Sequence, residues 1–214
     1  VTDDENNLLG RITFDDVIDE IKSEADESLR QISGIDSDTF EKTSTAIRTR
    51  GFWLGTNLIT ALIAASVINI FKDTLEQVIF LAVLMPIIAS MGGVAATQTL
   101  TITVRGLALG QIVKANYLYL FNRELIVGIS NGFLWAVILS LIACTWFQDW
   151  LLAWVICLSM IINLTAGVLS GMGIPILLRS LKLDPAVAGS VIVTTVTDVI
   201  GFLSFLGLAS YFYS

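Results

Sequence analysis

Five long apolar segments dominate the sequence, at about residues 51–71, 78–104, 125–147, 151–178 and 186–213. A helix needs about 20 residues to cross the hydrocarbon core of a membrane, which is about 30 Å thick, and each segment is long enough to do so. The chain is 55% hydrophobic, and its mean hydropathy of +0.79 is well above that of ordinary globular domains. The sequence therefore predicts an all-α membrane protein, with five transmembrane helices in residues 51–214.

Charge separates the first fifty residues from the rest. Residues 1–50 hold 13 of the 19 acidic residues and six of the 12 basic residues, so the net charge of −7 comes from this part. We predict a soluble, mostly helical piece here, with Thr13 as the N-cap of its first helix. Such a piece is not a domain, so we expect Val1 to lie inside a longer protein. No basic patch suggests a nucleic-acid partner.

Basic residues alternate between the connections and predict an orientation. Seven lie before the first span, between the second and third, or between the fourth and fifth: Arg48, Arg50, Arg105, Lys114, Arg123, Arg179 and Lys182. The opposite connections hold only Lys72. Because cytoplasmic loops carry the excess of Lys and Arg, we predict a multi-pass protein of the inner (plasma) membrane with a cytoplasmic N-terminus. Residues 105–123 are long enough for a short interfacial helix.

Asp198 is the one charged residue of the fifth apolar segment. A charge at membrane depth costs about 3 kcal/mol or more and usually faces a bundle interior or a watery path. Thr194 and Thr195 precede Asp198 by four and three residues, which places them on the same helical face. A carboxylate and hydroxyls on one stripe predict a cation site. The alternative is that the threonine hydroxyls bond back to their own helix and Asp198 is a protonated structural carboxyl.

The second apolar segment holds Pro86 and then a run of small residues that includes Ser90, Gly93 and Thr97. Pro86 removes one amide donor and frees a carbonyl acceptor. Carbonyls beside a pore can coordinate cations. The same small residues could instead serve only tight helix packing, so both interpretations stay open here.

Other polar and small residues predict contacts between helices. Three small pairs four residues apart predict packing faces, one of which could be a dimer seam: Gly128 and Gly132, Gly167 and Gly171, Ala61 and Ala65. Four asparagines predict interhelical hydrogen bonds: Asn57, Asn69, Asn131 and Asn163. Asn57 is also a weaker candidate for lining a pore.

Acidic residues cluster in the predicted first helix: Asp15, Asp16, Asp19, Glu20, Glu24, Asp26 and Glu27. A solvated surface is the usual explanation of such a cluster. Carboxylates that face other carboxylates repel each other, however, and a divalent cation would bridge them. An ion sensor is therefore the second interpretation.

Enzymatic chemistry finds little support in the sequence. Histidine is absent, which argues against Ser–His and zinc–histidine sites, and an intramembrane aspartyl protease needs two carboxylates where only Asp198 lies deep. We predict that the protein is not an enzyme. A cation channel, an ion-coupled transporter and a structural membrane subunit remain.

Several motifs resemble the MgtE family of bacterial magnesium channels and transporters. They are Pro86-Ile87-Ile88-Ala89-Ser90-Met91-Gly92-Gly93, Thr97-Gln98, Val104-Arg105-Gly106-Leu107-Ala108-Leu109-Gly110, Asp184-Pro185-Ala186 and Val193-Thr194-Thr195-Val196-Thr197-Asp198-Val199. The resemblance covers essentially the whole chain.

The resemblance implies a homodimer with a pore at the subunit interface, lined by the second and fifth spans. Hydrated Mg²⁺ would pass into the cytoplasm down its electrochemical gradient, as transported and regulatory ion, with no organic cofactor. Asp198 falls on the family's pore aspartate. We expect Ser90, Gly93, Thr194 and Thr195 to contact the hydrated ion with it. The expected pore-lining residues are Val94, Thr97 and Asn57.

The resemblance also divides the chain into parts. Residues 1–22 resemble the end of a CBS domain, residues 23–50 the family's connecting plug helix, and residues 51–214 its pore domain. Acids that sense cytosolic Mg²⁺ and close the channel would be Asp15, Asp16, Glu24 and Glu27.

The chain departs from the family pattern at three places. Val94 stands where the family usually has Asn, so an amide that would touch the hydrated ion is gone and selectivity could differ. Ser28 replaces a common acid, and Ser190-Val191-Ile192 replaces Gly-Pro-Phe.

The alternative function is an ion-coupled Na⁺/Mg²⁺ secondary transporter.

Overall fold

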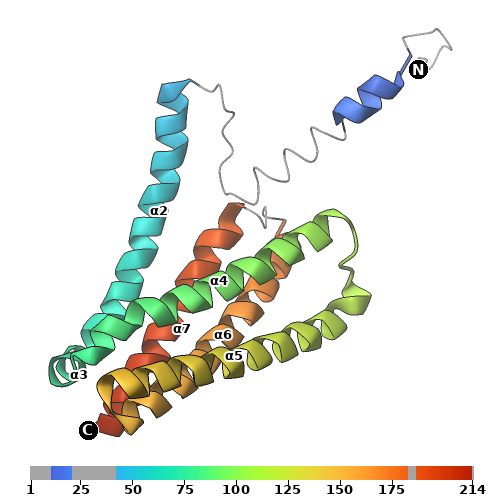
Figure 1. The fold of residues 1–214 in the computed structure, drawn as a ribbon. Helices are drawn as coiled ribbons and strands as arrows, with labels where there is room; N and C mark the ends of the chain where they lie inside the picture. The colour runs from blue at the N-terminus through green and yellow to red at the C-terminus, as the bar shows by residue number, and fades with distance from the viewer. Residues whose placement is uncertain (1–10, 21–41, 183–186, 214) are drawn as a thin grey trace.

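The computed structural model describes residues 11–20, 42–182 and 187–213, and these are mostly helical (Figure 1). After a helix at residues 14–20, the elements are α2 (Thr43–Ile70), α3 (Lys72–Gln77), α4 (Phe80–Ala108), η1 (Lys114–Asn116), α5 (Tyr117–Phe147), α6 (Trp150–Ser180) and α7 (Val187–Tyr213). Within these residues five helices, α2, α4, α5, α6 and α7, are long and apolar enough to cross a membrane. The predicted all-α fold with five spans is confirmed.

The helix ends differ from the predicted ones. α2 begins at Thr43, eight residues before the predicted span, and the six-residue α3 was not predicted. The predicted interfacial helix at 105–123 is wrong. The structure has only the single 3₁₀ turn η1 there, and α5 already begins at Tyr117. Residues 117–124 contain neither Gly nor Pro, so nothing prevents the transmembrane helix from extending beyond its apolar part.

Gly110 ends α4. Its φ of 66° lies in the left-handed region, which glycine adopts without steric cost. The amides of Gln111 and Ile112 then both donate to the carbonyl of Gly106, at 2.9 and 3.0 Å. This is how a helix C-terminus satisfies its last free acceptors, and it turns the chain toward α5.

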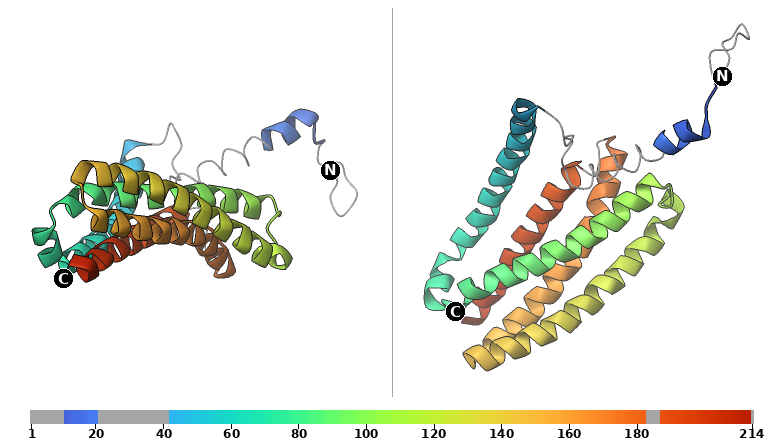
Figure 2. Two further views of the ribbon diagram at one scale, coloured as in Figure 1. Left: turned by 60° about the horizontal axis from the view of Figure 1, so that its bottom comes forward. Right: turned by 45° about the horizontal axis from the view of Figure 1, so that its top comes forward.

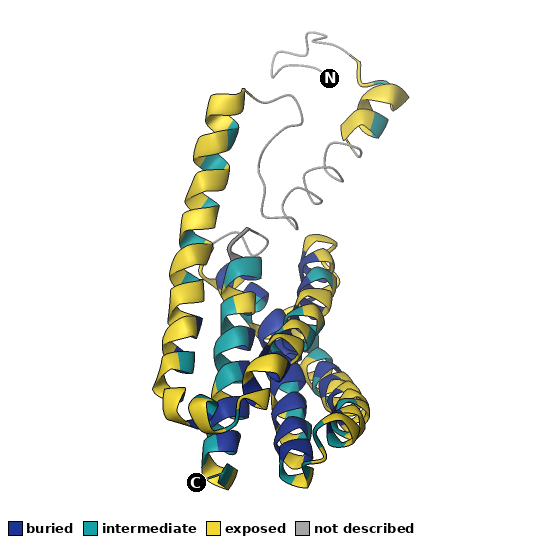
Figure 3. Ribbon diagram, turned by 60° about the vertical axis from the view of Figure 1, so that its left-hand side comes forward, coloured by how far each residue is buried: buried dark blue, intermediate teal, exposed yellow. Residues whose placement is uncertain are grey.

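The long helices run alternately in opposite directions (Figures 1 and 2). α6 lies in the middle of the bundle and packs against α4, α5 and α7, whereas α2 packs along α7 and makes no comparable contact with another described helix. Most of α2 is therefore exposed (Figure 3). The start of α2, the end of α4, the start of α5 and the end of α6 lie at one end of the bundle. These elements and the short segments next to them carry the seven basic residues discussed above.

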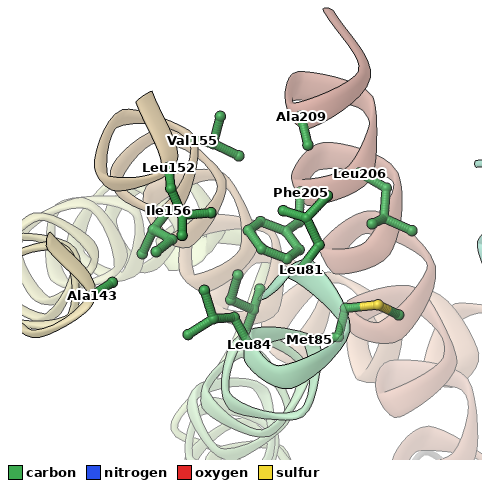
Figure 4. Close-up of a cluster of buried hydrophobic side chains, with 11 residues drawn as sticks. Leu81, Leu84, Met85, Ala143, Leu152, Val155, Ile156, Phe205, Leu206 and Ala209 are labelled. Atoms are coloured by element: carbon green, nitrogen blue, oxygen red, sulfur yellow. The ribbon is translucent and has the colours of Figure 1, made fainter. Parts of the chain in front are cut away.

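A tight apolar core joins four helices at the other end of the bundle, near the C-terminus (Figure 4). Its fully buried members include Leu81 and Leu84 of α4, Leu152 and Ile156 of α6, and Phe205 of α7. Lipid tails are as apolar as these side chains, so close packing rather than the hydrophobic effect holds such a core together.

Glycine pairs bring the helix backbones close together, as predicted. A Cβ on Gly128 or Gly132 of α5 would lie 3.3 or 3.2 Å from a backbone Cα of α6. A Cβ on Gly167 or Gly171 of α6 would lie 2.7 or 2.4 Å from a carbonyl oxygen of α4. The third pair behaves differently, because Ala61 and Ala65 are exposed on α2. The packing prediction for that pair is not met within the chain.

Asp149 fixes the α5–α6 turn to the C-terminal end of α7. Its carboxylate caps α6 by accepting from the amides of Leu151 and Leu152, at 2.8 and 3.2 Å, and it accepts a further hydrogen bond from the Tyr213 hydroxyl. Partial burial alone would raise the pKa of Asp149. The hydrogen bonds from Tyr213 and the two amides outweigh it and leave the pKa below its ordinary value.

Candidate functional site

A groove of about 730 Å³ lies between α4 and α7. It is lined by four polar side chains of α4, one polar side chain of α7, one glycine and two apolar side chains: Ser90, Thr97, Gln98, Thr101, Thr194, Gly93, Val94 and Ile102. The structure thus brings together Ser90, Gly93, Val94, Thr97 and Thr194, which the sequence analysis selected from two distant segments.

Helical periodicity explains why these α4 residues share one face. Ser90, Gly93, Thr97 and Thr101 are separated by three, four and four residues, which stacks them along one stripe. Pro86 lies inside α4 without ending it. The stripe of small and hydroxyl-bearing residues leaves room for the groove.

The threonine hydroxyls donate to their own helices, as the alternative interpretation expected. Thr97 donates to the Gly93 carbonyl at 2.9 Å, and Thr194 donates to the Ser190 carbonyl at 2.8 Å. A hydroxyl that donates in this way keeps its oxygen lone pairs as acceptors. The bonds therefore orient the hydroxyls without removing their capacity to contact a cation or its water shell.

Asp198 lies one helical turn beyond Thr194 on α7 and is half-buried. It does not line the groove itself, and within the part of the chain that the structure describes it has no hydrogen-bond or ion-pair partner. The described residues therefore include no hydrogen-bonded neighbour of Asp198, which the interpretation as a structural carboxyl requires. Thr195 is also half-buried outside the groove, with its hydroxyl bonded to the Val191 carbonyl at 2.7 Å.

Asn57 is not brought to the groove. It is exposed on α2, and α2 packs on α7 rather than on α4. Asn163 is the asparagine that bridges two helices, because its Nδ2 donates to the Ile88 carbonyl of α4 at 2.7 Å. The other three asparagines make no such bond among the described residues.

Asn163 of α6 packs against the two helices that form the groove. It is fully buried, and a Cβ on Gly92 of α4 or Gly201 of α7 would lie 2.3 or 2.9 Å from its Nδ2. Both glycines are close in sequence to groove residues or to Asp198. The Oδ1 atom of Asn163 is buried and has no partner within the described part of the chain.

The N-terminal acids form no described metal site. Asp15 and Asp16 are exposed in the helix at 14–20, and no group of three or more His, Cys, Asp or Glu side chains comes together in the described ranges. Hydrogen bonds from the Thr13 hydroxyl and amide lower the pKa of Asp16. The Asp16 amide approaches the Thr13 hydroxyl in return at 3.4 Å, which confirms Thr13 as an N-cap. Glu24 and Glu27 lie outside the described residues.

The sequence analysis missed Gln98 and Thr101 in the groove and Glu124 outside it. Thr101 follows Thr97 by four residues, so the helical stripe contained the signal. Glu124 precedes the predicted third span, yet it is only 6% exposed on α5. Its burial depends on how α5 packs on α6 and faces Thr99 of α4, which no local pattern reveals.

Known proteins resemble this chain over nearly its whole length. A family model described as MgtE, a divalent cation transporter, matches residues 85–208, more than half of the chain. The chain is 36% identical over 214 residues to the magnesium transporter MgtE of Bacillus subtilis, covering 99% of this chain and 48% of the relative.

Two further relatives carry the same name. The MgtE of Enterococcus faecalis is 32% identical, over 99% of this chain and 47% of the relative. That of Thermus thermophilus is 30% identical, over 98% of this chain and 47% of the relative. The chain spans about half the length of the relatives it matches. These matches, together with five helices that are long and apolar enough to cross a membrane, show that the chain belongs to the MgtE family of divalent cation transporters.

Proposed function

We propose that this chain is the membrane part of a magnesium channel and that hydrated Mg²⁺ passes along the groove between α4 and α7. The observation that carries the proposal is the groove itself. It joins hydroxyl and amide oxygens of two apolar helices, one turn from Asp198, which has no partner among the described residues. The named relatives are magnesium transporters, which is the reason for choosing Mg²⁺ among divalent cations.

The size of the groove suits an ion that keeps its water. Mg²⁺ dehydrates reluctantly, and six waters at about 30 Å³ each occupy about 180 Å³. The groove offers about 730 Å³, so the hydrated ion fits without losing its shell. Ser90, Thr97 and Thr194 would contact its waters, together with the backbone at Gly93 and the half-buried hydroxyl of Thr195.

A second copy of the chain would complete the site. The groove is open along one side, and among the described residues Asp198 is the carboxylate that lies one helical turn from it on α7. In a two-fold homodimer with the groove at the interface, the two Asp198 carboxylates would face each other and share the charge of one divalent cation. The Asp198 side chains, which lack a partner within the described chain, would then have one.

Direction and control follow from charge. The seven basic residues at one end of the bundle favour a protein of the inner (plasma) membrane whose N-terminus is cytoplasmic. A divalent cation moving inward gains about 4.6 kcal/mol per 100 mV of inside-negative potential, so no coupling ion is needed. Residues 1–22 and 23–50 would be a CBS remnant and a plug helix, with Asp15, Asp16, Glu24 and Glu27 binding cytosolic Mg²⁺ and closing the pore.

Flux measurement on the full-length protein in liposomes tests the proposal. Mg²⁺ uptake, followed with an internal magnesium dye under a potassium-set potential, should occur in the wild type and fall to background in Asp198→Ala. Asp73→Ala, which removes an exposed carboxylate of α3, is the matched control and should transport normally. Wild-type uptake by Asp198→Ala would refute the groove as the path.

A sodium gradient separates the channel from a coupled transporter. We expect the rate of Mg²⁺ uptake to follow the membrane potential and to be the same with and without sodium on either side. Uptake that requires a sodium gradient at zero potential would contradict the channel and favour Na⁺/Mg²⁺ exchange. The same liposomes with Mn²⁺, Co²⁺ and Ca²⁺ would show which divalent cations a pore that carries Val94 admits.

A further inference from the structure

A second cavity, of about 340 Å³, opens between α4 and α5, two helices that hardly touch each other. One end of its lining is polar and includes Arg123, Glu124 and Asn131 of α5. The other end is apolar and includes Trp135 of α5 and Leu164 of α6. A cavity with one polar and one apolar end suits an amphiphile rather than a bare ion.

The carboxylate of Glu124 is poorly compensated for so buried a charge. Glu124 is 6% exposed. The Thr99 hydroxyl donates to it at 3.3 Å, which is long for a hydroxyl donor. The nearest Arg123 nitrogen lies at 3.6 Å, on a side chain that is 54% exposed. A buried carboxylate is stable when it is paired and hydrogen-bonded, so the cavity has room for one further cationic donor.

Asn131 adds a polar side chain that is exposed on α5 and has no hydrogen-bond partner among the described residues. It follows Glu124 by seven residues, so it lies about 10 Å further along the same face of α5. No hydrogen bond to its side chain exists among the described residues. An unpaired amide at membrane depth costs several kcal/mol, which a hydrogen-bonding group of an occupant would offset.

The depth of these groups matches the layers of a lipid. The apolar part of α5 begins at Leu125, so Arg123 and Glu124 lie at the edge of the hydrocarbon, where lipid headgroups are found. Asn131 lies about 10 Å further along α5, inside the hydrocarbon edge, where an ester carbonyl is the deepest hydrogen-bonding group of a lipid, and Trp135 lies further in among the acyl chains. The two charges at the polar end are of opposite sign, and they complement a zwitterionic headgroup.

We propose that this cavity binds an aminophospholipid of the phosphatidylethanolamine class. The ammonium group donates to Glu124, the phosphate pairs with Arg123, and an ester carbonyl accepts from Asn131. The apolar end takes the start of one acyl chain. A divalent cation is disfavoured here because Arg123 and Glu124 together carry no net charge, whereas a zwitterionic headgroup offers each of them an opposite charge.

Headgroup chemistry provides the test. Phosphatidylcholine carries the same phosphate and charge, but its nitrogen has no N–H to donate. We would add phosphatidylethanolamine, phosphatidylcholine and phosphatidylglycerol in equal amounts to the full-length protein in detergent and measure the retained lipid by native mass spectrometry. The wild type should retain phosphatidylethanolamine about tenfold better than phosphatidylcholine, as expected for one charge-assisted hydrogen bond.

Variants separate the contributions of the two charges. Glu124→Gln should abolish the preference for phosphatidylethanolamine, and Arg123→Gln should lower the retention of both zwitterionic lipids. Glu76→Gln, which changes an exposed glutamate of α3, is the control and should behave as wild type. If Glu124→Gln does not fold, Asn131→Leu serves as the second variant. It should lower the retention of phosphatidylethanolamine and phosphatidylcholine equally.

Three results would overturn the proposal. The first is equal retention of the three lipids by the wild type. The second is a preference for phosphatidylethanolamine that survives Glu124→Gln. The third is displacement of lipid by millimolar Mg²⁺ in the wild type but not in Glu124→Gln, which would make the cavity a cation site instead.

Discussion

Gly171 of α6 is the position where the packing of α4 on α6 can be tested most directly. A Cβ added there would lie 2.4 Å from the carbonyl oxygen of Ala96 and 3.0 Å from the amide nitrogen of Leu100, both backbone atoms of α4. Gly173, two residues later in the same helix, is exposed and has nothing within 4 Å of an added Cβ. The substitutions Gly171→Ala and Gly173→Ala therefore add the same methyl group to the same helix in opposite surroundings.

The two substitutions are expected to change the free energy of unfolding in opposite directions. Carbon and carbonyl oxygen approach to about 3.3 Å without strain, so Gly171→Ala must push α4 and α6 apart by about 1 Å. Overpacking of this kind costs about 1–3 kcal/mol, against a gain of about 1 kcal/mol from replacing glycine in a helix. Gly173→Ala has the gain alone. We expect a net loss of up to about 2 kcal/mol for Gly171→Ala and a gain of up to about 1 kcal/mol for Gly173→Ala.

Thermal unfolding of the purified protein in detergent measures the difference. For a chain of this size 1 kcal/mol corresponds to about 2–4 °C in Tm, so the overpacking cost of about 1–3 kcal/mol should separate the two variants by about 2–12 °C. Tryptophan fluorescence and size-exclusion chromatography after heating give independent readings. If Gly171→Ala were as stable as Gly173→Ala, the close approach of α6 to the Ala96 carbonyl would be disproved.

Two further predictions concern the ends of the bundle. Because the pKa of Asp149 is lowered in the folded state, its contribution to stability is full above the ordinary carboxyl pKa and is lost as the pH falls through the folded value. Tyr213→Phe removes one of the hydrogen bonds that lower this pKa. The Tm should therefore fall less steeply between pH 5 and pH 3, the range around the ordinary carboxyl pKa of about 4. An unchanged pH profile of Tm would contradict this. In a chain without its native cysteines, Lys72→Cys should react with a membrane-impermeant maleimide in intact cells, whereas Lys182→Cys should react only after the cells are permeabilised. The reverse pattern would invert the proposed orientation.

Much of the fold could be predicted because hydropathy marks the part of each helix that lies in lipid. It does not mark the part beyond. Tyr117 begins α5 two turns before the predicted apolar run, since Asn122, Arg123 and Glu124, which separate residues 117–121 from that run, tolerate helix and do not interrupt it. The six residues of α3 are too few to show a period, so no pattern could reveal them.

The candidate site was predictable within each helix but not between helices. The spacing of Ser90, Gly93 and Thr97 puts them on one face of α4 from the sequence alone. Whether Thr194 meets that face depends on the packing of α7 against α4, which only the resemblance to a known family suggested. Asn57 shows the opposite case, because its helix packs elsewhere. Glu124 shows that burial of a charge at a helix end is decided by the neighbouring helix.

The attachment of α2 to α7 has a consequence for how the protein is made. Of the five long helices that the structure describes, α2 is made first and its main neighbour, α7, is made last. With Ile70 and Tyr213 at their ends, synthesis at about 5–20 residues per second separates their completion by roughly 7–30 s. During that interval α2 lacks its main neighbour. The groove also needs Thr194 of α7 beside α4, so the proposed ion path cannot form before α7 is made, and a chain terminated before α7 would lack that path.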